Sequence, residues 1–296
     1  MGHKTVAEMA KLWGLTERAV RKYCSIGKIE GIKLEGKRYL IPEDTLPPGR
    51  KNAKKFSDNN LLNVLKTERD GKVKGGIYHK VQVNLTYNSN HIEGSKLTED
   101  QTRFIFETNT IGADLSGVPV DDVVETSNHF RCIDLIIDDA KKVLTESLIK
   151  KLHEILKSGT SQSRVAWFRI GDYKLKPNEV GGEMTCPQKE VEAHIRELLE
   201  EYSAKEKKTI EDIIDFHQRF EKIHPFQDGN GRVGRLIMFK ECLAHNIIPF
   251  IINEEHRWYY YRGLKEWKNQ QEYLVETCLA AQDNFKAWLK YFNVKA

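Results

Sequence analysis

The sequence predicts a mainly α-helical protein in which a small basic domain precedes a larger helical domain. Apolar residues recur at spacings of three and four along most of the 296-residue chain, which is the period of a helix with one buried face. Residues 1–55 contain 13 Lys or Arg and 6 Asp or Glu, whereas the formal net charge of the whole chain is only +4. The length allows two domains, and the charge distribution places any surface for an acidic partner at the N-terminal end.

The expected N-terminal domain, residues 1–46, has the pattern of two short helices followed by a hairpin. A capping box begins the first helix at Thr5, and a second helix begins near Thr16. Two short strands are expected around Glu35-Gly36. Residues 5–42 resemble the small winged helix-turn-helix domains of the excisionase and MerR-like group.

This resemblance implies that the N-terminal domain binds DNA. The basic side chains expected on the second helix and at the hairpin tip suit contacts with phosphates, and they are Arg18, Arg21, Lys22, Lys37 and Arg38. The alternative is a helical module used for protein contacts or for dimerisation. A homodimer is one form in which helix-turn-helix proteins act.

Residues 47–76 are expected to form a linker. Pro47-Pro48-Gly49 and the glycine-rich run 71–76 both interrupt the helical period. A short helix over 60–66 is compatible with the residues between these two breaks.

The larger domain, residues 77–296, has mostly helical patterns. Its first segment suits a buried helix, although the alternation before Tyr87 also suits a strand. A capping box at Thr98 begins the next helix, in which Phe104, Ile105 and Phe106 are expected to be buried. Further helices are expected over 121–143, 148–157, 191–202, 210–223, from about 230, through Leu264 and Trp267, and over 272–292.

The segment from His224 to Arg235 has more polar and glycine residues than packing requires. The helix over 210–223 should stop before Pro225, which leaves His224 at its end. Gly229 and Gly231 lie where the next helix begins, so their N–H groups can approach a ligand without obstruction. The N-terminus of a helix favours an anion, and these residues therefore predict a phosphate site.

Three charged residues complete this predicted site. Arg232 and Arg235 are three apart on the first turn and can both reach one polyphosphate. Asp228 is too close to the anion site for a simple counter-charge, and a magnesium ligand is the better interpretation. His224 has an unperturbed pKa that suits a general base near neutrality.

Residues 224–235 resemble the Fic family signature, His-Pro-Phe-x-Asp-Gly-Asn-Gly-Arg-x-x-Arg, at every specified position. The resemblance implies a Fic-type helical bundle and a protein adenylyltransferase (AMPylator), which transfers AMP from Mg-ATP to a Ser, Thr or Tyr hydroxyl. It implies that His224 is the base and that Asp228 holds Mg²⁺. It further implies that ATP is bound by Gly229, Asn230, Gly231, Arg232 and Arg235.

A second resemblance concerns the segment Ser89 to Gly94, which is similar to the Fic inhibitory sequence, Ser/Thr-x-x-x-Glu-Gly/Asn. It implies an inhibitory helix around residues 84–94 in which Glu93 pairs with Arg235. A carboxylate and a γ-phosphate cannot share one bidentate guanidinium, so ATP would be excluded or bound unproductively. Glu93 is also a candidate for activating a water that removes AMP from a modified target.

Fic proteins also carry a β-hairpin flap that docks the target segment by strand addition. The candidate is Val180, Gly181, Gly182, Glu183 and Met184, and the alternative is a plain connecting hairpin. The aromatic run 258–261 is expected in the core, and the resemblance implies that Tyr260 or Tyr261 lines the adenine pocket.

The chemistry leaves alternatives open: removal of AMP, modification of the chain itself, and a DNA-binding regulator whose Fic domain senses nucleotide. Gly231 and Arg235 argue against the branch of the family that transfers phosphate. The expected partners are ATP, Mg²⁺ and a target protein, with no membrane partner, because no apolar run reaches the roughly 18 residues that a span needs. Five scattered cysteines indicate neither disulfides nor a zinc motif, so a cytoplasmic location is expected.

Overall fold

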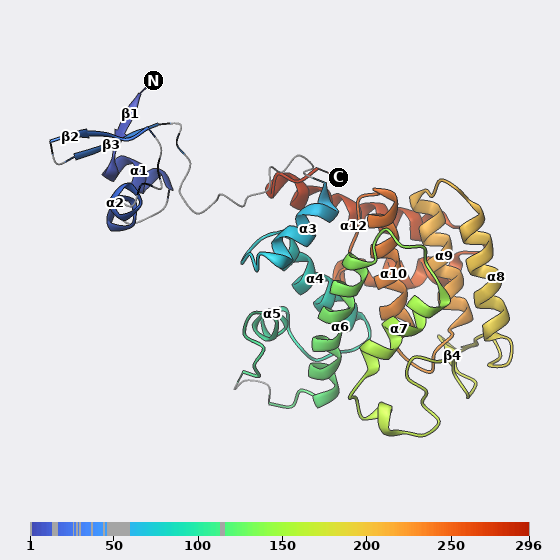
Figure 1. The fold of residues 1–296 in the computed structure, drawn as a ribbon. Helices are drawn as coiled ribbons and strands as arrows, with labels where there is room; N and C mark the ends of the chain where they lie inside the picture. The colour runs from blue at the N-terminus through green and yellow to red at the C-terminus, as the bar shows by residue number, and fades with distance from the viewer. Residues whose placement is uncertain are drawn as a thin grey trace. The chain divides into compact units, whose positions relative to one another are not determined.

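The computed structural model describes residues 2–13, 17–25, 27, 29, 31–36, 38–43, 45, 60–112 and 116–295. The chain divides into two compact units, Met1–Asp58 and Asn59–Ala296 (Figure 1). No helix among the described residues combines the length and the apolar character that crossing a membrane requires.

In the part of the first unit that the structure describes, there are two short helices and a three-stranded antiparallel sheet of order β1-β3-β2. Its elements are β1 (His3–Thr5), α1 (Val6–Trp13), α2 (Glu17–Ser25), β2 (Lys33–Glu35) and β3 (Arg38–Pro42). Its core is apolar and includes Val6, Met9, Val20, Cys24, Ile29 and Ile41. Strands β2 and β3 are the expected hairpin, whereas β1 was not expected, because three residues are too few for a recognisable period.

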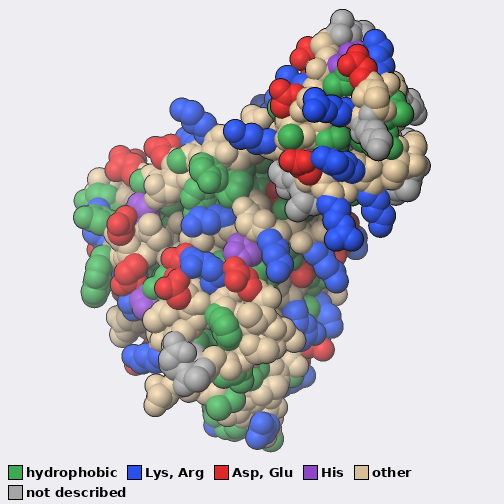
Figure 2. All heavy atoms as spheres, turned by 90° about the vertical axis from the view of Figure 1, so that its left-hand side faces the viewer, with side chains coloured by type: hydrophobic (Ala, Val, Ile, Leu, Met, Phe, Trp, Pro, Cys, Tyr) green, Lys and Arg blue, Asp and Glu red, His purple; other side chains and the backbone are tan. Residues whose placement is uncertain are grey.

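Helix α2 turns one basic face to solvent. Arg18, Arg21 and Lys22 are exposed, and Arg21 pairs with Glu17 one turn earlier at 3.1 Å. Arg38 is exposed at the start of β3. The visible face of this unit in Figure 2 carries several Lys and Arg side chains with acidic ones between them. Lys37 and residues 14–16, which the helix-turn-helix expectation also uses, lie outside the described residues.

Among its described residues, the second unit is helical apart from one small hairpin. Its helices are α3 (Leu61–Asp70), α4 (Ile77–Ile92), α5 (Glu99–Thr108), α6 (Val120–Asp138), α7 (Glu146–Lys157), α8 (Val191–Ala204), α9 (Ile210–Ile223), α10 (Asn230–His245), α11 (Arg257–Glu266) and α12 (Glu272–Tyr291), with two 3₁₀ turns, η1 (Gln162–Arg164) and η2 (Glu254–His256). Helix α10 contacts α4, α6, α7 and α9 (Figure 1). It is buried along nearly its whole length, so its first turn lies deep in the bundle.

Helix α3 changes the expected boundary between the domains. It is capped by Asn60 and buries Leu61, Leu62, Val64 and Leu65 against the bundle, where it contacts α4 and α6. Residues 60–76, expected within a linker over 47–76, therefore belong to the second unit. Their glycines form the tight connection from α3 to α4. The other residues of the expected linker, up to 59, lie outside the described residues.

Several local patterns have the expected outcome and two do not. Residues 77–92 form a helix rather than a strand, and Thr98 and Gln101 make both bonds of the capping box. Phe104 was expected in the core, but it is 43% exposed because it lies on the outer face of α5. Of the aromatic run 258–261, only Tyr260 is buried, since consecutive helical residues point in different directions.

Candidate functional site

The loop between α9 and α10 is held in one shape by its own side chains. His224 ends α9 in the left-handed conformation, with φ 52°, and its N–H donates to the Phe220 carbonyl. The Asn230 side chain accepts from Phe226 N–H at 2.8 Å and donates to Phe226 carbonyl at 2.9 Å. Phe226 is fully buried and stacks on His153, with ring centroids 3.9 Å apart. The loop is thus a rigid support for the residues around it.

The bonds from the Asn230 side chain to Phe226 differ from the role expected for Asn230. The Asn230 side chain was expected to bind a phosphate, but both of its polar groups are used inside the loop and it is 1% exposed. The N–H groups of Asn230, Gly231 and Arg232 have no partner within their helix, as at any helix start. These N–H groups, rather than the Asn230 side chain, are the part of this segment that suits an anion.

The two nitrogens of the His224 imidazole have different surroundings. Its Nδ1 lies 3.2 Å from the Glu221 carbonyl oxygen, which can only accept, so Nδ1 carries the proton. No described residue bonds Nε2, which therefore offers a free lone pair. Burial lowers the pKa of His224, opposed by the carbonyl contact, and keeps the ring neutral near pH 7.

His153 holds the back of the same loop and binds no charged group. Its Nδ1 accepts from Gly171 N–H at 2.9 Å, and its Nε2 donates to the Asp228 carbonyl at 3.1 Å. Burial, with Lys157 nearby, lowers the pKa of His153 to about 3. The ring is a neutral structural element.

Asp228 lies in a network of four alternating charges. Its Oδ2 is 2.7 Å from Lys157 Nζ and 3.5 Å from Arg232 Nη2, and Glu125 contacts both cations from the other side. Burial alone would raise the pKa of Asp228, but Arg232 and Lys157 hold it at about 2. The carboxylate is therefore ionised, and it is only half-buried.

The charged network opens into a cavity of about 250 Å³. Its lining joins the ends of α4 and α7 to the start of α10. It contains Asn90, Glu93, Gly94, Ser95, Asp121, Asp122, Glu125, Lys157, Ser161, Gln162, Asp228 and Arg232. Both candidate residues Asp228 and Glu93 thus face one solvent-accessible space.

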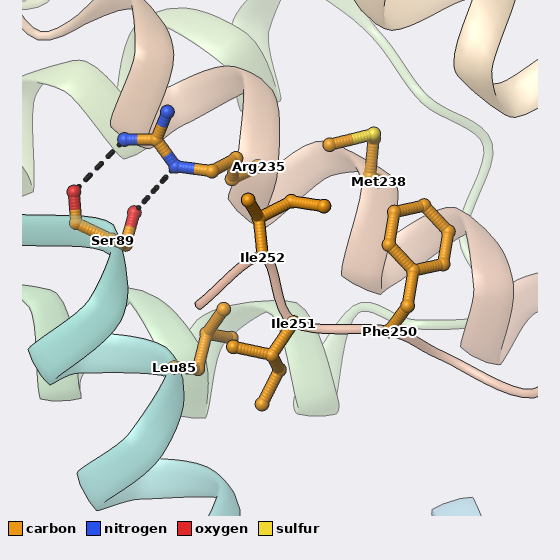
Figure 3. A pocket seen from close by; sticks show the side chains of 7 residues that line it. All are labelled: Leu85, Ser89, Arg235, Met238, Phe250, Ile251 and Ile252. Atoms are coloured by element: carbon orange, nitrogen blue, oxygen red, sulfur yellow. Dashed lines mark hydrogen bonds between the residues drawn. The ribbon is translucent and has the colours of Figure 1, made fainter. Parts of the chain in front are cut away.

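Arg235 is buried and fully engaged on the other side of the loop. Its Nη2 donates to Glu93 Oε1 at 2.7 Å and to the Ser89 carbonyl at 2.9 Å, and its Nε donates to Ser89 Oγ at 3.0 Å. Burial alone would lower the pKa of Arg235, but Glu93 raises it. Figure 3 shows the Ser89 bonds at the edge of a small, mostly apolar cavity.

Gly231 makes the contact between Glu93 and Arg235 sterically possible. A Cβ at this position would lie 2.2 Å from Glu93 Oε1 and 2.9 Å from Arg235 Nη1. The predicted pairing of Glu93 with Arg235 is therefore present and depends on the missing side chain. Gly94, the residue after Glu93, has φ 95° and lets the chain turn away from α4.

The two arginines do not converge on one point, although they were expected to reach one polyphosphate together. Arg232 points to Glu125 and Asp228, whereas Arg235 points to Glu93 and Ser89. Both guanidinium groups are at most 5% exposed and already paired with carboxylates. A phosphate would have to displace a carboxylate from either.

The two tyrosines expected near adenine have different positions. Tyr260 is 1% exposed, and its hydroxyl contacts His217 at 2.7 Å and Arg235 at 3.4 Å, so its ring belongs to the core. Tyr261 is partly exposed and donates to the Ile92 carbonyl at 3.0 Å. Neither lines the cavity of about 250 Å³. Tyr261 fastens the end of α4 that carries Glu93.

A small hairpin lies beside the loop. Strands β4 (Glu179–Val180) and β5 (Glu183–Met184) pair antiparallel through Gly181 and Gly182, whose φ angles of 59° and 83° suit a two-residue turn. Val180 is 50% and Met184 69% exposed. The expected hairpin is present, and its outer edges are unpaired among the described residues.

A clamp of three residues fixes the base of this hairpin to the loop. Lys174 Nζ donates to Asn178 Oδ1 at 2.7 Å and to Thr185 Oγ1 at 2.6 Å, which joins the two ends of the hairpin. Asn178 Nδ2 donates to the Phe226 carbonyl, and Lys174 N–H donates to the Pro225 carbonyl. The hairpin therefore has a fixed base next to His224.

The sequence reasoning missed Glu125, Lys157, Glu221 and the clamp. One signal was available: His153 and Lys157 are four apart on the apolar face of α7, which is unusual for two polar residues. Glu125 and Glu221 had no such signal, because a carboxylate on a helix is ordinarily solvated.

Known proteins are similar to the part of this chain that carries the site. Residues 143–242, from α7 to most of α10, match the Fic/DOC family. The chain is 29% identical over 188 residues to "Protein adenylyltransferase Fic" of Drosophila mojavensis, covering 60% of this chain and 35% of that one. The same named protein of Drosophila grimshawi is also 29% identical, with 60% and 36% covered.

Solved structures share the fold. A Fic domain containing signaling protein from Bacteroides thetaiotaomicron has a TM-score of 0.62 at 22% identity and covers 79% of this chain and 94% of its own. Fic-1 from C. elegans has a TM-score of 0.60 at 17% identity, with 78% and 72% covered. The chain spans about a third of the length of the curated relatives it matches.

Proposed function

Because the chain carries a domain of the Fic/DOC family, we propose that it is a protein adenylyltransferase that transfers AMP from ATP to a protein hydroxyl. The observation that carries the proposal is the loop from His224 to Arg232. It puts a neutral imidazole with a free Nε2 next to unpaired N–H groups at a helix start. An acceptor for a hydroxyl proton and a site for a phosphate are thus joined by one rigid segment.

The proposed step is a substitution at the α-phosphorus. The target hydroxyl oxygen attacks, a bond from oxygen to the α-phosphorus forms, and the bond to the bridging oxygen of the β-phosphate breaks. The hydroxyl proton moves to His224 Nε2, and pyrophosphate leaves. The N–H groups at the start of α10 stabilise the charge on the α-phosphate oxygens.

The site also suits Mg²⁺. Asp228 is ionised, half-buried and faces the cavity, and one or two carboxylates with phosphate oxygens and waters form an ordinary magnesium site. When bound there, Mg²⁺ would neutralise charge on the phosphates. Asp228 would hold it, while Lys157 keeps that carboxylate ionised and oriented.

Glu93 inhibits this reaction in our proposal. A γ-phosphate at Arg235 needs the donors that Glu93 and Ser89 now occupy, so ATP must displace Glu93 or bind in another position. Glu93 contacts Arg235 through one carboxylate oxygen, Oε1. Its Oε2 has no hydrogen-bond partner among the described residues, and Glu93 lines the cavity of about 250 Å³. Both observations support the second proposed activity, hydrolytic removal of AMP by water activated at Glu93.

We assign the hairpin the role of docking the target. Its base is anchored at the Phe226 carbonyl, close to His224, and strand addition at its unpaired edges would fix a target hydroxyl by main-chain bonds. The alternative is a hairpin that only connects its neighbours, and it gives no reason for two apolar side chains, Val180 and Met184, to be exposed.

The identity of the transferred group is tested with the Glu93→Gly protein and ATP labelled either on the α- or on the γ-phosphate. We expect Glu93→Gly to become labelled by α-labelled ATP but not by γ-labelled ATP. The double variant Glu93→Gly, His224→Ala should not become labelled. Label from γ-labelled ATP would contradict AMP transfer. For AMP removal, wild type but not Glu93→Gly should release AMP from protein that the variant has modified.

For the first unit we propose DNA binding through the exposed basic face of α2 and through Arg38 at the start of β3. Arg18→Ala, Arg21→Ala and Arg38→Ala should each weaken binding to duplex DNA and reduce its salt dependence, because each removes a phosphate contact. If the chain is instead a regulator whose Fic domain senses nucleotide, His224→Ala keeps its output while Arg21→Ala abolishes it.

A further inference from the structure

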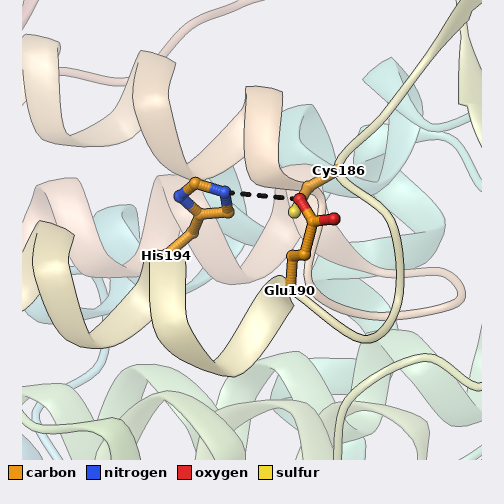
Figure 4. A group of neighbouring side chains, drawn as sticks. All are labelled: Cys186, Glu190 and His194. Carbon is orange, nitrogen blue, oxygen red and sulfur yellow. Dashed lines mark ion pairs between the residues drawn. The ribbon is translucent and has the colours of Figure 1, made fainter.

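Three side chains of different ligand type converge where the hairpin leads into α8. Cys186, Glu190 and His194 each place one ligand atom within 4.8 Å of the others, as Figure 4 shows. Cys186 is half-buried and the other two are exposed, so a cation can reach them from solvent. The cluster has no residue in common with the cavity at Asp228.

The spacing and chemistry of the cluster suit a transition metal. Glu190 is the N-cap residue of α8 and His194 is four residues further on, with His194 Nε2 3.8 Å from Glu190 Oε2. Tetrahedral zinc has bonds of about 2.0–2.3 Å, which puts its ligand atoms about 3.3–3.8 Å apart. Small side-chain rotations therefore bring all three atoms into range. Three protein ligands leave the fourth position to water.

His194 also has the outer partner that a metal ligand requires. Its Nδ1 lies 3.5 Å from Glu197 Oε2, one turn further along α8. A metal-bound imidazole usually donates its other N–H to a carboxylate, which fixes the tautomer and orients the ring. A simple surface ion pair with His194 needs only one glutamate, either Glu190 or Glu197. A metal site gives a role to both, because Glu190 binds the cation and Glu197 orients the ring of His194.

The cluster adjoins the clamp under the hairpin. Cys186 follows Thr185 directly, and Thr185 is tied to Lys174 and Asn178. A cation that joins Cys186 to α8 would hold the C-terminal end of the hairpin to that helix as well.

We propose that Cys186, Glu190 and His194 bind one divalent transition-metal cation, best suited to Zn²⁺, at the junction of the hairpin and α8. Binding replaces the thiol proton of Cys186, which passes to solvent. The proposal requires no particular activity at His224 and stands if the proposed AMP transfer fails.

The experiment titrates tag-free full-length protein with Zn²⁺ by calorimetry in excess Mg²⁺, and with Co²⁺ to observe thiolate-to-metal absorption. One ion per chain is expected, with a thiolate band for Co²⁺. Cys186→Ser should remove the band and His194→Ala should abolish 1:1 binding. The other cysteines are buried, so they cannot supply the band without unfolding.

Matched variants separate this site from others. Glu197→Gln should weaken Zn²⁺ binding about 10- to 100-fold, whereas Glu192→Gln on the same helix and Asp228→Ala should leave it unchanged. Zn²⁺ should also slow amide exchange over 183–186 in wild type but not in Cys186→Ser. Absence of saturable binding, or binding that survives both Cys186→Ser and His194→Ala, would overturn the proposal.

Discussion

At the scale of single residues, the proposed inhibition depends on one oxygen of Glu93. Glu93 occupies Arg235 only because Gly231 has no side chain in the way, and Ser89 completes the set of acceptors. The contact is charged and mostly shielded from water, so it excludes a competing anion more strongly than a surface pair would.

Glu93→Gln should therefore increase the response to ATP while keeping the shape of the side chain. A neutral amide competes poorly with a phosphate for Arg235, so ATP with Mg²⁺ should raise the melting temperature of Glu93→Gln more than that of wild type. Thermal unfolding over a nucleotide titration measures the difference. Equal shifts in the two proteins would show that Glu93 does not oppose nucleotide binding.

The buried carboxyl group of Glu221 should make the free energy of unfolding depend on pH. Burial raises the pKa of Glu221 to about 8, and Glu93 adds to the rise. The unfolded chain ionises this group near about 4.3, so unfolding releases a proton between these values. Its stabilising contribution is present below the lower pKa and is lost as pH rises through about 8.

The comparison of wild type with Glu221→Gln isolates this contribution. The free energy of unfolding of wild type, minus that of the variant, should fall as pH rises from about 5 to about 9. Denaturant unfolding at a series of pH values measures it. A difference that is constant with pH would mean that Glu221 is ionised throughout.

At the scale of elements, α7 supplies a buried cation to a site built on α10. Lys157 is 2% exposed and stands between Glu125 and Asp228. Lys157→Met leaves two carboxylates without this partner and should lower the free energy of unfolding by about 3–5 kcal/mol. Lys151→Met, an exposed position on the same helix, should change it by at most about 0.5 kcal/mol. Similar effects in both variants would contradict the role of the network.

The hairpin is testable through its main chain. Next to a two-residue turn, Val180 and Glu183 exchange the inward bonds, so the Met184 N–H faces outward and is free to bond a target. In a Glu93→Gly background, Met184→Pro should reduce AMP transfer to protein but not ATP binding, whereas Met184→Ala should keep both. Loss of transfer in Met184→Ala alone would assign the effect to the side chain instead.

Local patterns in the sequence predicted most elements but few of the contacts between them. The helix Ile210–Ile223 follows from its apolar period and the following proline, and the loop after it from its glycines. Strand β1 is too short for a period, and Trp258 is exposed although its neighbour Tyr260 is core. The Glu125 network joins α6, α7 and α10, and no local pattern records contacts between segments so far apart.

At the scale of the whole molecule, the two units should be separable. Each has its own apolar core. Residues 59–296 alone should fold cooperatively and keep ATP binding, and residues 1–58 alone should keep the salt-dependent DNA binding. Unfolding curves and DNA titrations of the two fragments measure this. Aggregation of 59–296 would show that its bundle needs the first unit.

The most direct test of the central claim uses α-labelled ATP with Mg²⁺ on three proteins: wild type, Glu93→Gly, and Glu93→Gly with His224→Ala. We predict label retained on protein only in Glu93→Gly, since this variant alone has both an Arg235 released from Glu93 and the base at His224. Equal labelling of wild type and Glu93→Gly would contradict the inhibition, and labelling that survives His224→Ala would contradict the assignment of the base.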